Sequence, residues 1–295
     1  MELKIFVILI NYKNAKLTID CIDSIYKANN EVRIVVVDNN SEDDSVIRIR
    51  DKFDDIIIIE SKTNLGFSGG NNLGIKYALN NSADIIMLLN NDTIVDKNIF
   101  NNFILHNDGN SVLVPKIYFF GTDILWYAGG TVSKITGNAV HYGYNKKDDI
   151  KYCENKFVNF ATGCCVWIPR GAFEKIGYMD EEYFLYFEDV DYSLKMNLNS
   201  INIKYISPAV VWHKVSSSSG GNTSKLSNYY NTRNRLMCID IYSSYFYTTA
   251  FWYSVITRYI RIFQKQLKGD ISWKSIRKGI HDYKKGISGK VDVYE

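Results

Sequence analysis

Short apolar runs alternate with amphipathic stretches from the start of the chain to about residue 115. The runs are Ile5–Ile10, Val32–Val37, Ile56–Ile59 and Ile85–Leu89. Between them, apolar residues recur at helical spacing, and these are Leu17, Cys21, Ile22 and Ile25, then Val46, Ile49 and Phe53. Short strands joined by helical crossovers predict β-α-β units. We therefore expect an α/β fold with a doubly wound, mostly parallel sheet and a Rossmann-like first half.

The sequence shows no Pro/Ser-rich linker and no internal repeat between its parts. We therefore expect one continuous body made of three segments, 1–115, 116–235 and 236–295. The middle segment has glycine turn signals and no clear period, which predicts irregular strands with one or two helices.

Aromatic residues gather between Leu236 and Ile262, ahead of a basic end. Residues 258–295 hold 10 Lys or Arg and 4 Asp or Glu, a net +6, whereas residues 1–257 hold 25 and 28, a net −3. Cys238–Thr257 approaches the length of a spanning helix but contains Asp240 and many hydroxyl groups. We therefore expect amphipathic helices on an anionic membrane surface, and no nucleic acid, since no nucleic-acid motif accompanies the charge. Alternatively, these helices pack on the rest of the chain or on a second copy in a homodimer.

The cysteines point to a reducing compartment. Their number is odd and no C-x-x-C pair occurs, which argues against a disulfide framework and a zinc site. The run Ile5–Ile10 is too short for a secretory signal, so we expect it to be a first strand. The expected location is cytoplasmic, at the inner face of the cell membrane.

Polar residues follow the predicted strands at the edge where parallel α/β sheets bind ligands. Asn11 follows the first strand and Asp38-Asn39-Asn40-Ser41 the second. The Asp38 carboxylate could accept hydrogen bonds from a nucleotide base or a ribose hydroxyl. Alternatively, it caps a helix over Glu42–Phe53.

Asn90-Asn91-Asp92-Thr93 follows the fourth predicted strand. A carboxylate with amide neighbours can hold Mg²⁺ or Mn²⁺ through oxygen ligands. Such ions keep several waters and take oxygens from substrate phosphates, so one protein carboxylate would suffice. The alternative is a polar turn.

Asn64–Gly74 is rich in glycine and runs into a predicted helix. Its backbone amides could approach a ligand closely. It lacks both the Walker and the dinucleotide spacing, so a tight turn is an equal alternative to a phosphate site.

Three carboxylates crowd into Phe187-Glu188-Asp189-Val190-Asp191. Their repulsion is unfavourable unless one is protonated, hydrogen-bonded or near a metal, and such strain is common at acid/base sites. The alternative is an acidic helix start favoured by the helix dipole. His213 and Arg233 are candidate site residues only because they occur together with these motifs.

Taken in order, these motifs resemble the family-two inverting glycosyltransferases of the GT-A fold, and within them the branch of bacterial rhamnosyltransferases. The resemblance covers nearly the whole chain. Its most specific matches are Thr162–Cys165, Phe173–Glu181, Phe184–Tyr192, Pro208–His213 and Tyr229–Asn234. Asn90-Asn91-Asp92 stands where the family has its D-x-D metal motif, which leaves Asp92 as the only acidic residue there. The Gln-x-x-Arg-Trp motif of processive synthases is absent, which favours addition of a single sugar.

The resemblance implies a role for each candidate residue. The catalytic residues would be Asp189, as the base, and Glu188, and Asp92 and His213 would meet the Mg²⁺ or Mn²⁺ ion. The donor-binding residues would be Asn11, Asp38, Asn40, Gly66, Gly69, Asn72, Asn91, Arg233 and Asn234. The acceptor-binding residues would be Thr162, Gly163, Tyr186 and Asp191. Residues 1–115 would then bind the nucleotide-sugar, and residues 116–235 would bind the acceptor and carry the catalytic residues.

The implied function is an inverting transfer of one sugar from a nucleotide-diphosphate donor to a hydroxyl of a glycan, with a lipid-linked oligosaccharide as the expected acceptor. The resemblance favours dTDP-rhamnose as donor, and UDP-hexoses (Gal, Glc or GlcNAc) come next. A polyprenyl-phosphate glycosyltransferase of the same fold is the nearest alternative. A non-catalytic nucleotide- or sugar-binding module is a remote one, because a pure binder would need no base.

Overall fold

A computed structural model describes residues 3–29, 31–215 and 224–293 of the chain. Its first four strands are parallel and lie in the order β3-β2-β1-β4. They are β1 (Ile5–Asn11), β2 (Arg33–Asp38), β3 (Ile57–Glu60) and β4 (Ile85–Leu89). Each coincides with a predicted apolar run to within one or two residues, and β1, β2 and β4 are almost entirely buried. The expected doubly wound α/β fold is confirmed.

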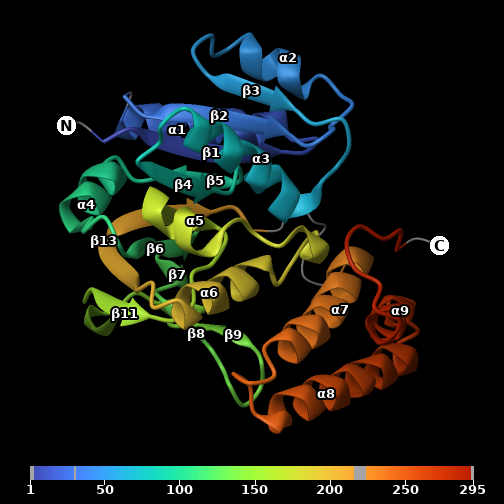
Figure 1. The fold of residues 1–295 in the computed structure, drawn as a ribbon. Coiled ribbons are helices and arrows are strands. Elements are labelled where there is room, and N and C mark those ends of the chain that lie inside the picture. The colour runs from blue at the N-terminus through green and yellow to red at the C-terminus, as the bar shows by residue number, and fades with distance from the viewer. Residues whose placement is uncertain (1–2, 30, 216–223, 294–295) are drawn as a thin grey trace.

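Three helices form the crossovers of this half, and Figure 1 shows them beside its strands. They are α1 (Ala15–Ala28), α2 (Ser45–Arg50) and α3 (Gly66–Asn80). Cys21, Ile22 and Ile25 of α1 are fully buried, as their spacing predicts. The helix expected over Glu42–Phe53 is shorter, because α2 ends at Arg50 and Phe53 packs from the turn beyond it.

The sheet continues with strands from the middle of the chain. β12 lies antiparallel beside β4, and β6, β7 and β10 follow it outward. The long strand β13 pairs with β6, β5 and β11, and β8 and β9 form a separate hairpin. These strands are β5 (Thr93–Val95), β6 (Val112–Phe119), β7 (Ile124–Tyr127), β8 (Gly130–Val132), β9 (Ala139–His141), β10 (Lys146–Lys147), β11 (Lys156–Val158), β12 (Cys165–Pro169) and β13 (Ile203–His213).

The remaining helices include a group at the C-terminal end, drawn in orange to red in Figure 1. The helices are α4 (Ile99–His106), α5 (Arg170–Ile176), α6 (Glu188–Leu198), α7 (Lys225–Ile241), α8 (Thr248–Leu267) and α9 (Trp273–Lys284), with 3₁₀ turns at Ile150–Tyr152 and Glu181–Tyr183. The apolar stretch 238–257 is divided between α7 and α8. No helix in the described part of the chain is long and apolar enough to span a bilayer. The expected segment boundaries fall inside β6 and α7.

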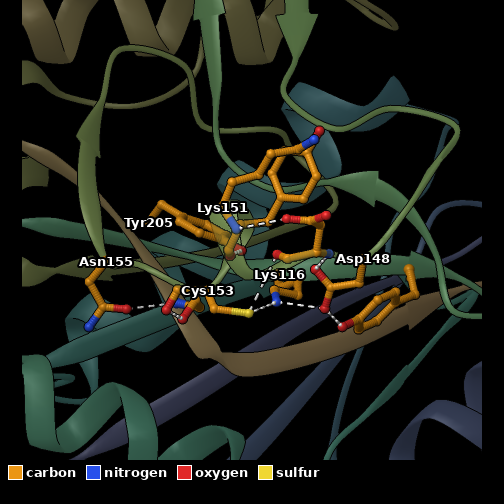
Figure 2. A network of polar contacts seen from close by, with 10 residues as sticks. Lys116, Asp148, Lys151, Cys153, Asn155 and Tyr205 are labelled. Carbon is orange, nitrogen blue, oxygen red and sulfur yellow. Dashed lines mark hydrogen bonds and ion pairs between the residues drawn. The ribbon is translucent and has the colours of Figure 1, made fainter.

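A polar network fastens the segment after β10 to β6 and β13, as Figure 2 shows. Lys116 of β6 is buried, and its Nζ lies 2.8 Å from the Asp148 carboxylate and 3.5 Å from Cys153 Sγ. The Tyr118 hydroxyl also donates to Asp148. Burial opposes the charge on Asp148, but Lys116 and Tyr118 outweigh it and lower the pKa of that carboxyl. Ser207 and Tyr205 of β13 donate to backbone carbonyls of 152–153, so the network closes from both strands.

Lys116→Met should destabilise the fold. The methionine fills a similar volume but leaves Asp148 without its buried cationic partner, and an uncompensated group of this kind costs about 1–3 kcal/mol. The free energy of unfolding from urea denaturation measures the loss.

The matched control is Lys147→Met on β10, which β7 separates from β6 in the sheet. The ion pair of Lys147 with Asp123 is exposed, at 76% and 62% for the two side chains, against 5% and 22% for Lys116 and Asp148. A surface change of this kind shifts stability by less than about 0.5 kcal/mol. Equal losses in the two variants would contradict the role given to the buried pair.

Candidate functional site

A chain of side-chain hydrogen bonds crosses the carboxyl edge of the parallel strands. Asn11 at the end of β1 donates to Asp38 Oδ1 at 2.8 Å and accepts from the Thr18 hydroxyl at 2.8 Å. Asn91, after β4, donates to the same hydroxyl at 2.9 Å. All four residues are buried. The structure thus brings together Asn11, Asp38 and Asn91, which the sequence placed at three separate strand ends, and Thr18 joins them.

The Asp38 carboxylate is held by the turn that follows it. It accepts from the Ser41 amide at 3.0 Å and from the Ser41 hydroxyl at 2.5 Å. The carboxylate therefore caps this turn, and not the helix that was its expected alternative partner, because α2 begins only at Ser45. Asn40 occupies the turn with a left-handed backbone, at φ +62°. Asp38 is 5% exposed at the edge of the sheet.

The glycine-rich segment is part of a helix and not a loop. α3 begins at Gly66, so Gly69 and Asn72 lie in its first two turns. A Cβ at Gly66 would lie 2.1 Å from the Phe184 carbonyl oxygen, and one at Gly69 would lie 2.7 Å from Leu65 Cβ. The glycines therefore allow close backbone packing around the start of α3.

The amide side chains of Asn39 and Asn72 hold the first half of α3 in place, and Asn39 was not predicted as a site residue. Asn39 bonds to the Leu65 amide and the Gly66 carbonyl. Asn72 bonds to both backbone groups of Met179 and to the Glu181 carboxylate. The expected donor contact of Asn72 would therefore compete with a buried set of protein bonds.

Segment 162–164 lies between the two groups of candidate catalytic and metal-binding residues. The Gly163 amide donates to Asp189 Oδ2 at 3.2 Å. The next residue, Cys164, neighbours His213, whose Nε2 lies 3.1 Å from Asp92 Oδ1. Thr162 is 3% exposed, and its hydroxyl accepts from the Cys164 amide. One short backbone stretch therefore connects the Asp189 carboxylate to the Asp92–His213 pair.

The Asp92–His213 pair fits a divalent cation in its chemistry. His213 Nδ1 is buried and has no hydrogen-bond partner within the described residues. Burial alone would lower the pKa of His213, but Cys164 and the Asp92 carboxylate together raise it. Across the described ranges, no group of three His, Cys, Asp or Glu side chains could hold a metal ion. The pair would therefore supply a nitrogen and a carboxylate, and the other ligands would come from water and a substrate diphosphate.

Glu188 and Asp189 are adjacent, but their surroundings act differently on the pKa values of the two carboxyl groups. Glu188 is 6% exposed, and burial together with the Asp189 charge raises its pKa well above the ordinary value. Burial also raises the pKa of Asp189, to about 6, while the Gly163 and Val190 amides limit the rise. Burial therefore favours the protonated form of Glu188, and Asp189, whose charge two backbone amides stabilise, is the better candidate to accept a proton.

The loop before Asp189 is strained. Phe184, Tyr186 and Phe187 have φ values of +62°, +67° and +74°, a backbone region that bulky residues rarely adopt. Leu185 N donates to the Tyr183 carbonyl at 2.7 Å, which closes a tight γ-turn around Phe184. Strain of this kind persists only where surrounding contacts enforce it.

Arg233 and Asn234 of α7 supply those contacts. Asn234 Nδ2 lies 2.8, 2.9 and 2.7 Å from the carbonyl oxygens of Tyr183, Leu185 and Tyr186. Arg233 donates to the carbonyls of Glu182, Tyr183 and Gly289. Both side chains are fully buried. They were expected beside the donor phosphates, but the structure uses them to hold the loop that leads to Asp189.

Asp191 does not line the site with its neighbours. Two positions along α6 from Asp189, it faces the interior, where it is 1% exposed. Its carboxylate accepts from the Tyr242 hydroxyl at 2.8 Å and lies 3.0 Å from Lys195 Nζ. Its expected contact with the acceptor has no support in this arrangement. Tyr186 is partly exposed, within the strained loop.

An aromatic cluster beside His213 was not predicted. The Trp126 ring lies edge-on to His213 at 4.7 Å and to His141 at 4.6 Å. His141 stacks on Phe160, and burial lowers its pKa to about 4, so it is neutral. These residues come from the irregular middle segment, where no periodicity or motif marked them.

Comparison with known proteins identifies the family. The family model described as Glycosyl transferase family 2 matches residues 6–177. The low-salt glycan biosynthesis hexosyltransferase Agl10 of Haloferax volcanii is 30% identical over 213 residues, which cover 67% of this chain and 62% of that protein. This chain thus spans less than two thirds of that relative.

Solved structures show the same fold. GalNAc-T7, solved with UDP, GalNAc and Mn²⁺, gives a TM-score of 0.62 at 15% identity over 81% of this chain and 48% of its own. The mannosyltransferase PcManGT of Pyrobaculum calidifontis, solved with GDP-Man and Mn²⁺, gives 0.56 at 12% identity over 99% and 78%. S. aureus TarS 1-349 in complex with UDP gives 0.53 at 19% identity over 80% and 65%. The fold is therefore the GT-A fold of glycosyltransferases.

Asn234→Ala should loosen the loop before Asp189. The change removes the Asn234 donor from the carbonyls of Leu185 and Tyr186, whereas the Tyr183 carbonyl keeps the Leu185 amide and Arg233, so we expect a loss of about 1–3 kcal/mol in the free energy of unfolding. Amide hydrogen exchange of residues 184–187 should become faster, because the strained backbone loses what enforces it.

Asn231→Ala on the same helix is the control. Among the described residues, its side chain donates within α7, to the Ser227 carbonyl at 2.9 Å. We expect little change in exchange at 184–187. If both variants exchanged like the unmodified protein there, the loop would not depend on Asn234.

Proposed function

The chain belongs to Glycosyl transferase family 2, and we propose that it is an inverting glycosyltransferase that moves one sugar from a nucleotide-diphosphate donor to a glycan hydroxyl. The observation that carries the proposal is geometric. The Gly163 amide holds the Asp189 carboxylate at 3.2 Å, and segment 162–164 connects that carboxylate to the Asp92–His213 pair.

Asp189 acts as the general base in this proposal. It removes the proton of the acceptor hydroxyl while that oxygen attacks the anomeric carbon and the nucleotide diphosphate leaves. One displacement inverts the anomeric centre, and no covalent sugar–enzyme intermediate forms. The Gly163 amide keeps the carboxylate oriented and ionised, and the neutral Glu188 avoids a second negative charge beside it.

Asp92 and His213 would hold Mg²⁺ or Mn²⁺, which when bound would neutralise the charge that develops on the departing diphosphate. The 3.1 Å approach of His213 Nε2 to Asp92 Oδ1, which brings a ring nitrogen and a carboxylate together, supports this assignment. Two of the structural neighbours were solved with Mn²⁺. Asn11, Asp38 and Asn91 form the polar edge on which we propose that the nucleotide lies.

We retain dTDP-rhamnose as the proposed donor from the sequence resemblance, with UDP-hexoses as the alternative. Among the similar proteins, TarS was solved with UDP and PcManGT with GDP-Man, and the relative from Haloferax volcanii is named a hexosyltransferase. The proposed acceptor is a lipid-linked oligosaccharide at a membrane surface. The outward apolar residues of α8 support this choice, because they are exposed in the part of the chain that the structure describes.

Asp189→Asn should abolish transfer and leave donor binding nearly intact. An amide cannot accept the proton, and general-base catalysis contributes roughly 10²–10⁴-fold. Turnover measured by release of the nucleotide diphosphate in the presence of acceptor tests the assignment. A variant that kept more than about a tenth of the original turnover would refute it.

Glu188→Gln is the matched control. The glutamine preserves the shape and the neutral state that burial imposes on Glu188. We therefore expect turnover within about threefold of the unmodified protein, well under the smallest loss from a missing base. A loss as large as that of Asp189→Asn would move the catalytic role to Glu188.

Chelation should stop the reaction, and Asp92→Ala should weaken metal-dependent nucleotide binding. The carboxylate supplies the acidic ligand of the proposed ion, so its loss removes charge and geometry together. Hydrolysis of dTDP-rhamnose, UDP-hexoses and GDP-mannose with and without Mn²⁺ measures both the metal requirement and the donor. Full activity in excess EDTA would exclude a metal from the mechanism.

A further inference from the structure

A polar cavity of about 220 Å³ lies against α7 and α8, away from the candidate active site. Three arginines line it together with Asn138, Tyr253 and Ile260. Arg235 comes from α7, whereas Arg258 and Arg261 come from α8. We call this space the arginine cavity. Figure 1 shows the β8–β9 hairpin, which carries Asn138 in its loop, reaching toward this pair of helices.

The arginine cavity contains buried positive charge without a negative partner. Arg235 and Arg258 are 6% and 4% exposed. None of the ion pairs formed within the described residues includes Arg235, Arg258 or Arg261. Arg235 donates to the Thr136 carbonyl and Arg258 to the Asn231 carbonyl. Arg235 Nε is buried and has no acceptor in the described part of the chain.

Buried cations require a counter-charge, because taking an unpaired ion out of water is costly. The charged groups that act on Arg258 are Arg235 and Arg261, and burial together with these neighbours lowers the pKa of Arg258. Arginine stays protonated at neutral pH even so. The site is therefore incomplete without an anion, and guanidinium groups bind phosphate oxygens in a fork geometry.

The face of α8 beside the cavity is apolar and exposed. Seven of its large side chains point outward along one stripe, and they are Trp252, Tyr253, Ile256, Tyr259, Ile260, Phe263 and Leu267. They recur at helical spacing, opposite the buried Ser254, Arg258 and Ile262. Tyr253 and Ile260 belong both to this stripe and to the wall of the arginine cavity.

We propose that the arginine cavity binds the phosphate headgroup of an anionic membrane lipid while the apolar stripe of α8 enters the acyl layer. An anionic lipid carries a phosphate that could enter the arginine cavity and apolar chains that could contact the stripe beside it. The Tyr and Trp residues of the stripe suit a position at the membrane surface, since aromatic side chains with a polar atom favour the membrane interface. The inference deepens the proposed membrane contact and does not require that glycosyl transfer occurs.

Two other occupants explain less of the structure. A soluble phosphate would use the arginines but leave seven apolar side chains in water. A second copy of the chain would cover the stripe, but a two-fold interface places the same patch on both sides and would bring a second set of arginines into the contact. Neither satisfies both the charge and the apolar surface.

Vesicle co-sedimentation of the full chain, without any sugar donor, tests the proposal. We expect tighter binding to phosphatidylcholine vesicles that contain phosphatidylglycerol than to phosphatidylcholine alone. R261Q and R258Q should each weaken binding to the anionic vesicles about fivefold, the effect of one basic group near such a surface. R277Q, an exposed arginine on α9 outside the cavity, removes the same charge and should have a smaller effect.

A second pair of variants tests the stripe. F263S should weaken binding to both kinds of vesicle, and L105S, an exposed leucine on α4, should not. Thermal unfolding of each variant verifies that it is folded. If R258Q is unstable, R261Q alone tests the contribution of the cavity arginines to vesicle binding. Donor hydrolysis is measured in a separate assay, so a failure of the proposed glycosyl transfer can be distinguished from a failure of lipid binding.

Three results would overturn the proposal. The first is unchanged binding of R261Q and R258Q to anionic vesicles. The second is a soluble ligand, shown by inorganic phosphate raising the melting temperature of the unmodified protein but not of R258Q while vesicle binding is unaffected. The third is a stable dimer in lipid-free solution that F263S dissociates.

Discussion

The candidate active site depends on one side chain that lies 45 residues away from the proposed base. The Asn234 amide gathers the carbonyls of Tyr183, Leu185 and Tyr186, and so holds a loop with three left-handed, non-glycine residues. Such a backbone is unfavourable in isolation and needs external bonds to persist. Because α6 starts directly after this loop, Asn234 also sets where Asp189 lies. A strained loop braced from a neighbouring helix gives the carboxylate a defined position before any substrate arrives.

Burial then decides the chemistry that this position permits. The loop carries Glu188 into the interior, where losing a proton is unfavourable, and leaves Asp189 partly accessible with two backbone amides to stabilise its charge. Two adjacent carboxyl groups would otherwise compete for the same ionisation. The strained loop and the different surroundings of the two acids are therefore one property of the structure. A change that relaxed the loop would alter both.

The sequence predicted the parts of the fold that depend on local pattern. The apolar runs located β1 to β4, and residues just past the strands marked a polar edge because parallel strands end together. Roles set by distant contacts were not predictable. Gly66 suggested a phosphate loop, but its small size serves the approach of Phe184. Arg233 and Asn234 suggested donor contacts, but their partners lie about 50 residues earlier in the chain. Trp126 and His141 carry no motif, and only the fold brings them beside His213.

Helix α7 connects the two sites through three consecutive residues. Arg233 and Asn234 hold the loop before Asp189, and Arg235, about 100° further around the helix, lines the arginine cavity. A helix is stiff over so short a distance, so the orientation of α7 fixes both sets of contacts at once. On the proposed docking, a lipid phosphate bound to Arg235 would therefore stabilise the same helix orientation that braces the catalytic loop. Membrane contact and the geometry of the proposed base would then be energetically linked through α7, without a separate moving part.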